Sequence, residues 1–599
     1  MAEYRAPVKD ALFALRHVGE LEKLASTERY AHADLETVES VLEEHGRFMQ
    51  EVFAPANAIG DREGLEWSPE GVKVPKAFTE AYQKFVEAGW QGLNAHTEYG
   101  GAGFPEAVFS LGAEFMCAAN NALTMAPGLT TAAIELLQEW GTEEQKEVYL
   151  RKLVTGEWTG TMNLTEPQAG SDVGLSTTRA VPQDDGTYRI TGTKIFISFG
   201  EHDMAENIIH FVLARLPDAP PGTKGISLFL VPKFLVEEDG SIGQRNDVRC
   251  VSIEHKMGIH GSPTCVMSFG DEGGAVGYLV GEENRGMRAM FTMMNSARIA
   301  VGIQGVGLGD AAYQKALAYA HERRQGTEIG GDSKGPAPII VHPDVRRMLL
   351  SMRSSVEATR ALVVYNSAAI DLSRALEGDE AEFWREIAEL LTPVTKAWCT
   401  DVGMEVTSTA IQVFGGMGYI EESGVAQHFR DARIAPIYEG TNGIQAMDLV
   451  GRKLPMRMGG VVNDHLQRMR DLDAELEKAG EDLASIRSNL AEAVAALTSA
   501  TEWIMTNGLA DPKEALAGAT PYLRMFGTVT GGWLMARQAL AARAELDAGS
   551  DDADYLRAKV ATARFYCEQV LPTAAGLVPS VTAGASVLYE VDGESLASV

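Results

Sequence analysis

Apolar residues recur at helical spacing through the first part of the chain. Between Leu12 and about Leu137 they return every three to four positions, as in Val38, Val41 and Leu42. This spacing lines one face of an α-helix. A glycine-rich turn at residues 98–103 interrupts it. The pattern predicts a helical first domain.

The pattern changes between about Gly156 and Val280. Apolar residues here form short runs rich in β-branched and aromatic side chains, separated by Gly, Pro and Asp. The clearest runs are residues 188–190, 208–214 and 226–231. Such runs predict the strands of a small sheet or barrel.

Helical spacing returns after Gly286 and continues to Arg324. A glycine-rich stretch at residues 330–336 predicts a loop, and further helices are expected from Pro343 to Leu454. The pair Gly459-Gly460 marks a boundary. Four segments beyond it are predicted to form amphipathic helices: residues 466–487, 490–504, 522–546 and 553–571.

Composition places the chain among ordinary globular proteins. Its 599 residues exceed what one core needs, since a domain takes about 150 residues. Hydrophobic residues make up 45% and charged residues 23%, so we expect it to be folded throughout. The five cysteines are scattered without CxxC spacing. This distribution favours a reducing compartment and argues against a disulfide framework or a metal site.

The net charge is strongly negative. Lys and Arg total 52 against 83 Asp and Glu, a net charge of −31 that opposes binding to phosphate backbones or anionic lipid. We therefore expect no nucleic-acid partner. No run approaches about 18 uninterrupted apolar residues, so no stable membrane insertion is expected. The first residues show no signal-like or transit-like pattern, which predicts a cytoplasmic location.

One carboxylate is conspicuous in residues 437–445. Glu439 stands between Tyr438 and a glycine turn in an otherwise apolar run. Burial can raise a glutamate pKa from about 4.3 toward about 6 to 7, where the carboxylate can remove a weakly acidic C–H proton. Taken alone, a Glu-Gly pair is more often a solvated surface turn.

Four other stretches accompany this motif, and the order of all five decides between the two interpretations. They are Leu164–Asp172, Lys194–Ser198, Gln412–Tyr419 and Arg430–Arg433. With Tyr438-Glu439-Gly440-Thr441 they follow the order found in acyl-CoA dehydrogenases. The chain resembles this flavoenzyme family from about residue 40 to residue 455. The segment past Leu454 resembles the C-terminal helical appendage of its longer members, and the whole looks most like the bacterial 3-methylmercaptopropionyl-CoA dehydrogenase group. The first about forty residues resemble the N-terminal helical segment of that group.

The resemblance implies an α+β fold with five segments. They are an N-terminal helical segment (1–40), an N-terminal α-domain (41–155), a middle β-domain (156–285), a C-terminal α-bundle (286–455) and an additional helical domain (460–599). It also implies a homodimer, because the appendage would cover the surface on which shorter members form tetramers.

The implied reaction is the α,β-dehydrogenation of an acyl-CoA thioester. Glu439 would take the α proton, FAD would accept the β hydride, and electrons would pass to electron-transfer flavoprotein. The backbone N–H of Glu439 and a flavin ribityl hydroxyl would hold the thioester carbonyl. A second branch of the family places its base on a helix before an arginine. The equivalent residue here is Ala297, which cannot take a proton.

The resemblance also implies a set of flavin contacts. It consists of Met162, Leu164, Thr165, Ser171, Phe196, Ser198, Arg323, Gln412, Gly415, Gly416, Thr441 and Gln445. Arg323 would reach a neighbouring subunit's FAD, because a guanidinium suits pyrophosphate. Met162 replaces a common aromatic residue, and Gly326 replaces a common phenylalanine. Each residue also has a structural interpretation, such as a capped turn or a glycine-rich helix end.

The implied substrate contacts are Ser171, Asn295, Arg298, Tyr438 and Gly440. An arginine such as Arg298 can equally lie on a solvated helix face. Short to medium acyl chains are expected, with 3-(methylthio)propanoyl-CoA as one candidate. Two alternatives stay open: an oxidase that reoxidises the flavin with oxygen, and a catalytically silent acyl-CoA-binding scaffold.

Three other polar residues are interpreted as structural. The proline after Glu166 predicts a role in a turn, and neither His96 nor His260 has a partner at metal-ligand spacing.

Overall fold

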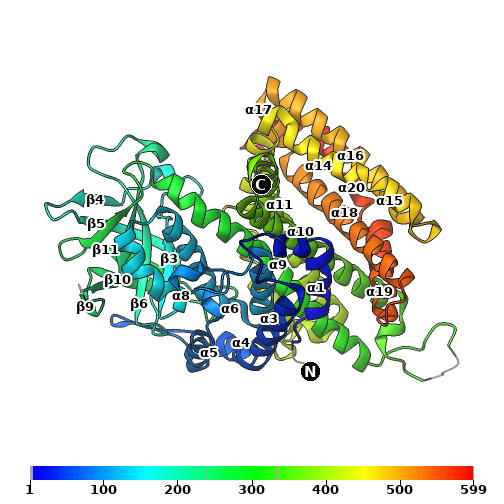
Figure 1. Cartoon of the computed structure of the whole chain (residues 1–599), viewed down its shortest axis with the longest axis horizontal. Helices are drawn as coiled ribbons and strands as arrows, with labels where there is room; N and C mark the ends of the chain where they lie inside the picture. The colour runs from blue at the N-terminus through cyan, green and yellow to red at the C-terminus, as the bar shows by residue number, and fades with distance from the viewer. Residues whose placement is uncertain (1–3, 238, 332–334, 598–599) are drawn as a thin grey trace. The chain divides into compact units, whose positions relative to one another are not determined.

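The computed structural model describes residues 4–237, 239–331 and 335–597. The chain forms two compact units, each assembled from separate segments. The first unit contains Met1–Glu43, Pro105–Glu114 and Val301–Val599, and the second contains Glu44–Phe104 and Phe115–Ala300. Figure 1 shows the elements of both units. The α+β class predicted from the sequence is confirmed, while the division into five segments stays a prediction.

The second unit contains a twisted, mostly antiparallel sheet of eight strands. The hydrogen-bonded order is β10-β11-β5-β12-β7-β6-β3, with β4 paired to β5. Its strands are β3 (Trp158–Asn163), β4 (Arg179–Pro182), β5 (Tyr188–Ser198), β6 (Asn207–Ala214), β7 (Ser227–Pro232), β10 (Val248–Ile253), β11 (Thr264–Phe269) and β12 (Ala275–Val280). Every residue of β6 is buried, which explains why apolar residues fill all of its positions except Asn207 and His210. The predicted strand region is therefore confirmed.

Helices and two small hairpins complete the second unit. The hairpins pair β1 (Glu66–Ser68) with β2 (Gly71–Lys73), and β8 (Phe234–Val236) with β9 (Ile242–Arg245). The helices are α4 (Ala54–Glu63), α5 (Lys76–Glu87), α7 (Glu143–Gln145), α8 (Arg151–Thr155), most of α6 (Glu106–Trp140) and the first part of α9 (Gly286–Glu322). The first hairpin interrupts a region that the sequence predicted to be helical apart from the turn at residues 98–103. It is three residues long on each side, too short to leave a clear alternating pattern.

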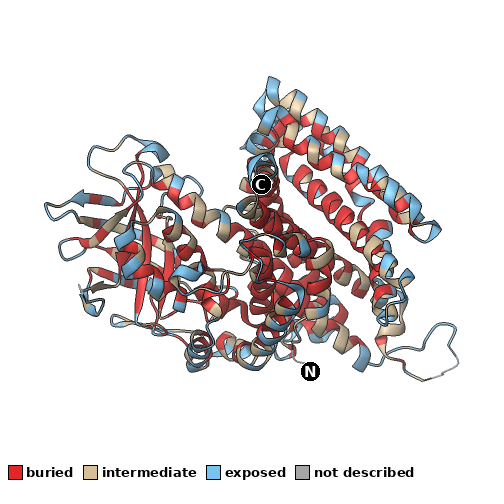
Figure 2. Ribbon diagram, viewed as in Figure 1, coloured by how far each residue is buried: buried red, intermediate tan, exposed pale blue. Residues whose placement is uncertain are grey.

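The first unit is helical. Its first elements are α1 (Val8–His17), α2 (Leu21–Ala25) and most of α3 (Leu35–Phe48), and its central ones are the later part of α9 (Gly286–Glu322), α10 (Pro343–Ala375), α11 (Gly378–Phe414), α12 (Val425–Ala432) and α13 (Asn442–Asp448). Figure 2 shows α10 and α11 buried over much of their length. The predicted loop at residues 330–336 falls partly on residues 332–334, which lie outside the described residues.

The C-terminal appendage belongs to the first unit. It consists of α14 (Gly460–Asp471), α15 (Asp473–Lys478), α16 (Ala484–Ala510), α17 (Pro512–Ala517), α18 (Ala519–Asp547), α19 (Ala553–Phe565), α20 (Thr573–Gly576), α21 (Val578–Thr582) and α22 (Ser586–Tyr589). The prediction of one helix over residues 466–487 was wrong, because Gly480 takes a φ of +91° and ends the helical path. The predicted gap at residues 488–489 was also wrong, since α16 continues through it.

Glycine allows α18 to approach α11 closely. A Cβ atom at Gly527 would lie 2.2 Å from Trp398, and one at Gly531 would lie 2.6 Å from the same indole. Neither distance is compatible with a side chain. These two glycines therefore let the appendage pack directly on the central bundle.

A buried ion cluster connects the N-terminal helix, the bundle and the appendage. It consists of Asp10, Glu114, Asp310, Arg353, Glu357, Arg360 and Lys559. Arg360 contacts Asp10 at 2.6 Å, while Lys559 contacts Asp10 and Glu357, each at 2.8 Å. The cluster has four acids for three bases, and burial raises the pKa of Asp310 to about 7 despite the nearby Arg360.

Within the described residues, no helix combines the length and apolar composition needed to cross a bilayer.

Candidate active site

Glu439 lies in a tight turn immediately before α13. Its side chain is half-buried and its φ is +58°, a left-handed conformation that costs a non-glycine residue about 1 to 3 kcal/mol. Gly440 follows with φ +76°, and a Cβ there would meet Gln445 Nε2 at 2.8 Å. Such backbone strain persists only where surrounding contacts hold it, and it concentrates at functional sites.

Asn442 attaches this turn to α11. Its amide nitrogen donates to Ala397 O at 3.1 Å and to Asp401 Oδ1 at 2.7 Å, and its Oδ1 accepts from Lys396 Nζ at 2.9 Å. Thr441 caps α13 by accepting from the Ile444 N–H at 3.3 Å. These bonds fix the backbone on the C-terminal side of Glu439.

Two further side chains hold the turn. Tyr438 donates its hydroxyl hydrogen to Gln304 Oε1 of α9. Gln445 is fully buried, and its amide donates to the carbonyls of Glu439 at 3.1 Å and Gly440 at 3.3 Å. In the described part of the chain, Gln445 Oε1 is buried without a hydrogen-bond partner. A buried oxygen without a hydrogen bond is unfavourable, so this atom calls for a hydrogen-bond donor from another group.

In the second unit, Glu166 organises the loop after β3. It is 2% exposed and accepts from the backbone and hydroxyl groups of Thr177 and Thr178, at 2.6 to 3.1 Å. Lys194 Nζ contacts it at 2.9 Å. Burial opposes ionisation, but Lys194 and these hydrogen bonds lower the pKa of Glu166 to about 2. The predicted structural role of Glu166 agrees with this geometry.

Lys194 and its neighbour also hold the loop after β3 against the last residues of β5. Lys194 Nζ also donates to Leu164 O at 2.9 Å, and the Ile195 N–H donates to Thr165 O at 2.9 Å. Phe196 follows with a φ of +60°, and its side chain is 58% exposed. An aromatic ring held outward by a strained backbone is unusual for a strand, since burial normally stabilises such a side chain.

The other predicted flavin residues of this unit lie nearby in the chain but differ in burial. Met162 is half-buried in β3 opposite Phe211 of β6, and it packs on the core rather than pointing into solvent. Ser198 is half-buried and pairs with Thr264 of β11. Ser171 is exposed in the loop, one residue before the turn that Asp172 caps.

A second group of predicted residues lies where α9 and α11 end. Tyr319 stacks on Phe414, with ring centroids 4.1 Å apart, and this contact brings the two helix ends together. Arg323 is exposed just after α9, and Gln412 is exposed on the last turn of α11. A Cβ at Gly415 or Gly416 would meet no atom within 4 Å, so both glycines border open space.

Gly326 stands where related sequences commonly have phenylalanine, and its backbone conformation explains the difference. Its φ is +69°, which disfavours the phenylalanine common at this place. The segment then turns back, with Gln325 N–H donating to Ala337 O at 3.0 Å.

The predicted substrate residues on α9 are close to one another. Arg298 is 5% exposed and donates to Asn295 Oδ1 at 3.4 Å, while Asn295 is exposed. The alternative of a solvated Arg298 is therefore wrong. Ala297 is buried at 7% exposure on the same helix.

His96 and His260, the two histidines considered as metal ligands from the sequence, have ordinary hydrogen-bond or ion-pair partners. His260 contacts Asp61 at 2.9 Å and the carbonyl of Lys256 at 2.9 Å, and His96 accepts from the Glu98 N–H.

Family models match most of the chain. They are the acyl-CoA dehydrogenase N-terminal domain (residues 35–157), middle domain (161–271) and C-terminal domain (284–454), and the acetyl-CoA dehydrogenase C-terminal-like domain (466–592). The chain is 47% identical to the 3-methylmercaptopropionyl-CoA dehydrogenase of Ruegeria pomeroyi, over 95% of this chain and 96% of that protein. The chain belongs to the acyl-CoA dehydrogenase family. It is an oxidoreductase that acts on a CH–CH group.

Two solved structures show the same fold along nearly the whole of this acyl-CoA dehydrogenase. Caenorhabditis elegans ACDH-11 in complex with C11-CoA has a TM-score of 0.77 at 20% identity, covering 95% of this chain and 93% of that one. A Bacillus anthracis acyl-CoA dehydrogenase complexed with FAD has a TM-score of 0.71 at 22% identity, covering 94% and 90%.

Some residues that hold the turn before α13 had no sequence signal. Gln304, Lys396 and Asp401 lie on α9 and α11, far from the Glu439 motif in sequence. Asn442 is inside the motif, but its partners 41 to 46 residues away follow only from the packing of α13 on α11.

Proposed function

We propose that this acyl-CoA dehydrogenase oxidises an acyl-CoA to the trans-2-enoyl-CoA with Glu439 as the catalytic base and FAD as cofactor. The supporting observation is the strained turn at Glu439, which α11, Gln304 and Gln445 hold from three sides. A base must keep its position to within a fraction of an ångström, and such a rigid turn meets that requirement.

Three features of the chain fit a bound flavin dinucleotide. Gly415 and Gly416 border open space, as a backbone that approaches a dinucleotide requires. Phe196 presents an exposed ring, and buried Gln445 Oε1 has no partner within the described residues. We assign Thr165, Ser171, Ser198, Thr441 and Gln412 to polar contacts, Leu164 and Met162 to packing, and Arg323 to the pyrophosphate.

In the proposed reaction, the Glu439 carboxylate takes the α proton and its backbone N–H donates to the thioester carbonyl as negative charge develops there. The flavin supplies the acceptor for the β hydride when bound. Tyr438 and Gly440 border the acyl group, and Asn295 with Arg298 meets the pantetheine. The arginine on α9 is buried, so we assign it to positioning Asn295 as well.

We further propose electron-transfer flavoprotein as the electron acceptor and a short or medium acyl chain as substrate, with 3-(methylthio)propanoyl-CoA as the first candidate. The 47% identity to a 3-methylmercaptopropionyl-CoA dehydrogenase supports this choice. A panel of acyl-CoA substrates compared by kcat/KM would rank the chain lengths, since one methylene changes binding by about 1 to 3 kcal/mol.

The variant Glu439→Gln tests the base directly. It should retain FAD and bind acyl-CoA, yet lose turnover by about 10³-fold or more, because an amide cannot take a proton. The matched control is Glu422→Gln, an exposed glutamate in the same unit. Flavin bleaching at the wild-type rate in Glu439→Gln would exclude Glu439 as the base. Failure of wild-type protein to bleach with any acyl-CoA would contradict the proposed function itself.

We also propose a homodimer, in which the appendage occupies the surface that a second dimer would use. Light scattering of the full-length protein should give the mass of two chains. A tetramer mass would contradict this assembly.

A further inference from the structure

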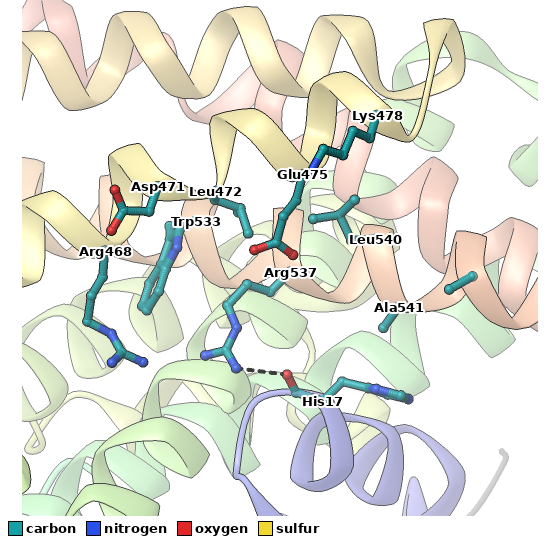
Figure 3. A pocket seen from close by; sticks show the side chains of 11 residues that line it. His17, Arg468, Asp471, Leu472, Glu475, Lys478, Trp533, Arg537, Leu540 and Ala541 are labelled. Carbon is teal, nitrogen blue, oxygen red and sulfur yellow. Dashed lines mark hydrogen bonds between the residues drawn. The ribbon is translucent and has the colours of Figure 1, made fainter. Parts of the chain in front are cut away.

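A pocket with a volume of about 740 Å³ lies within the first unit. The helices that line it are not the ones that hold the Glu439 turn. The N-terminal helix α1 forms one side, and α14, α15 and α18 of the appendage form the others (Figure 3). Its apolar surface comes from Leu472, Trp533, Leu540 and Ala541. A volume of this size suits a small organic molecule.

The first cation of the pocket is Arg537 of α18. Its Nη2 donates to His17 O at 3.1 Å and to Glu20 Oε1 at 3.0 Å, and Figure 3 marks the bond to His17. Its Nη1 is buried without a hydrogen-bond partner in the described part of the chain. The guanidinium carbon lies 5.3 Å from the Trp533 ring centroid. Arg537 is therefore held in place but incompletely satisfied.

The second cation is Arg468 of α14. Its guanidinium carbon lies 5.1 Å from the Trp384 ring and 5.4 Å from the Phe383 ring, so aromatic faces surround it. Among the described residues no carboxylate oxygen lies within 4.0 Å of it, and its Nε is buried without a partner. A partly buried cation that lacks a counter-anion is costly, and aromatic faces compensate only in part.

A third donor lies between these two arginines. Figure 3 shows the Trp533 indole between the side chains of Arg468 and Arg537. Trp533 is 2% exposed, and its Nε1 has no hydrogen-bond partner within the described residues. Buried indole N–H groups normally find an acceptor. Each of these three pocket-lining side chains thus keeps one buried donor nitrogen without a described partner, beside the apolar residues of the pocket.

Acidic residues of the pocket lie at its edge. Asp471 and Glu475 are exposed, as is Lys478 beside them. Asp471 accepts from Gln467 at 2.6 Å, and no described ion pair connects either acid with Arg468 or Arg537. Charges in this exposed position are screened by solvent and affect the two inner guanidiniums weakly.

We propose that this pocket binds a small organic oxyanion, a carboxylate or a phosphate monoester that carries a short apolar chain. Three donor side chains that each keep a nitrogen without a described acceptor select an acceptor-rich group, and guanidinium suits both carboxylate and phosphate. The apolar floor then receives the hydrocarbon part. The chain has a net charge of −31, so most of its surface repels anions. The two arginines make this pocket a local position that can attract an anion.

Isothermal titration calorimetry on the FAD-containing protein tests the proposal with three probes of equal chain length: octanoate, octyl phosphate and octylamine. One or both oxyanions should bind at one saturable site per chain, while octylamine should not. Octanoate alone would identify a carboxylate site, and octyl phosphate alone a phosphate site. Absence of saturable binding by both oxyanions, or equal binding of octylamine, would overturn the proposal.

The variant Arg468→Gln assigns the binding to this pocket. Affinity should fall about tenfold or more, because a charge-assisted hydrogen bond is lost. Arg564→Gln provides the matched control, since Arg564 lies on α19 with its side chain 60% exposed and paired to Glu568. Binding that survives Arg468→Gln unchanged belongs to another site and overturns the assignment.

A second variant tests the apolar floor without removing a charge. Ala541→Leu should fill part of the pocket and weaken octanoate or octyl phosphate severalfold, while folding and acyl-CoA turnover stay unchanged. Inorganic phosphate serves as the probe without a chain. If it binds as tightly as octyl phosphate, or if Ala541→Leu leaves octyl binding intact, the apolar part of the proposal is wrong.

Discussion

Two groups of buried charge stabilise this protein in different ways. In the second unit, Glu166 and Lys194 form an isolated pair, each less than 3% exposed, and Glu166 is the carboxylate on which Lys194 depends. In the first unit, the buried ion cluster spreads its charges over α1, α6, α9, α10 and α19. The pair fixes one loop, whereas the cluster joins segments distant in sequence.

The two groups differ in how many counter-charges each buried charge has. Removal of Glu166 leaves the Lys194 ammonium buried with the Leu164 carbonyl, and it frees donors on Thr177 and Thr178. Removal of Lys559 leaves Asp10 still bound to Arg360 and Glu357 still bound to Arg353 at 2.7 Å. Loss of one member of the pair therefore leaves the other charge without a counter-charge. In the cluster, each remaining charge keeps a partner of opposite sign.

The largest effect is expected from Glu166→Gln. The change retains the shape but leaves Lys194 without a counter-charge, so the free energy of unfolding should fall by about 3 to 5 kcal/mol. FAD content should fall with it, because the loop carries Thr165 and Ser171. Urea unfolding and the visible spectrum measure the two effects. Glu157→Gln is the control, since the Glu157–Lys152 pair in the same unit is about 40% exposed and such pairs contribute about 0 to 1 kcal/mol.

A smaller loss is expected from Lys559→Met. Both of its acids keep another cation, so the cost should be about 1 to 3 kcal/mol rather than that of an orphaned charge. Lys9→Met is matched to it, because Lys9 also joins α1 to the start of α19, through an exposed 2.6 Å contact with Asp552. That control should change stability by less than about 1 kcal/mol. A loss as large as that of Glu166→Gln would contradict the role of the additional counter-charges.

The pH dependence of stability should distinguish the two groups by sign. The pKa of Asp310 is raised from 3.8 to about 7, so its contribution is complete below about pH 3.8 and is lost as pH rises to 7. The pKa of Glu166 is lowered from 4.5 to about 2, so its contribution is present above pH 4.5 and is lost as pH falls toward 2. The two slopes are opposite.

The variant Asp310→Asn measures this smaller effect. Relative to Asp310→Asn, the wild-type protein should lose stability between pH 5 and pH 7, with a slope of at most about 1.4 kcal/mol per pH unit. Relative to Glu166→Gln it should show no slope in that range. Unfolding curves at four pH values suffice, and a flat difference for Asp310→Asn would show that the acid excess of the cluster is compensated elsewhere.

The two groups also differ in how far the sequence could predict them. Glu166 lies in a motif, and its threonine partners follow within 12 residues, so a structural turn was predictable. Asp10 and Lys559 are 549 residues apart, and no spacing rule connects them. The strands, the long helices and the Glu439 motif followed from local patterns. The break at Gly480, the Asn442 anchors and the pocket at Arg468 depend on packing between distant helices.

The contact between α1 and the appendage has a consequence for biosynthesis. Phe13 packs on Ala542 and Leu556, residues that the ribosome adds more than 500 positions later. At about 5 to 20 residues per second, this interval lasts roughly half a minute to two minutes. Residues 44–300 are complete well before it ends. Helix α1 is translated before both of these helices, so it completes its native contacts late, and the face that packs on Ala542 and Leu556 stays exposed until α18 and α19 arrive.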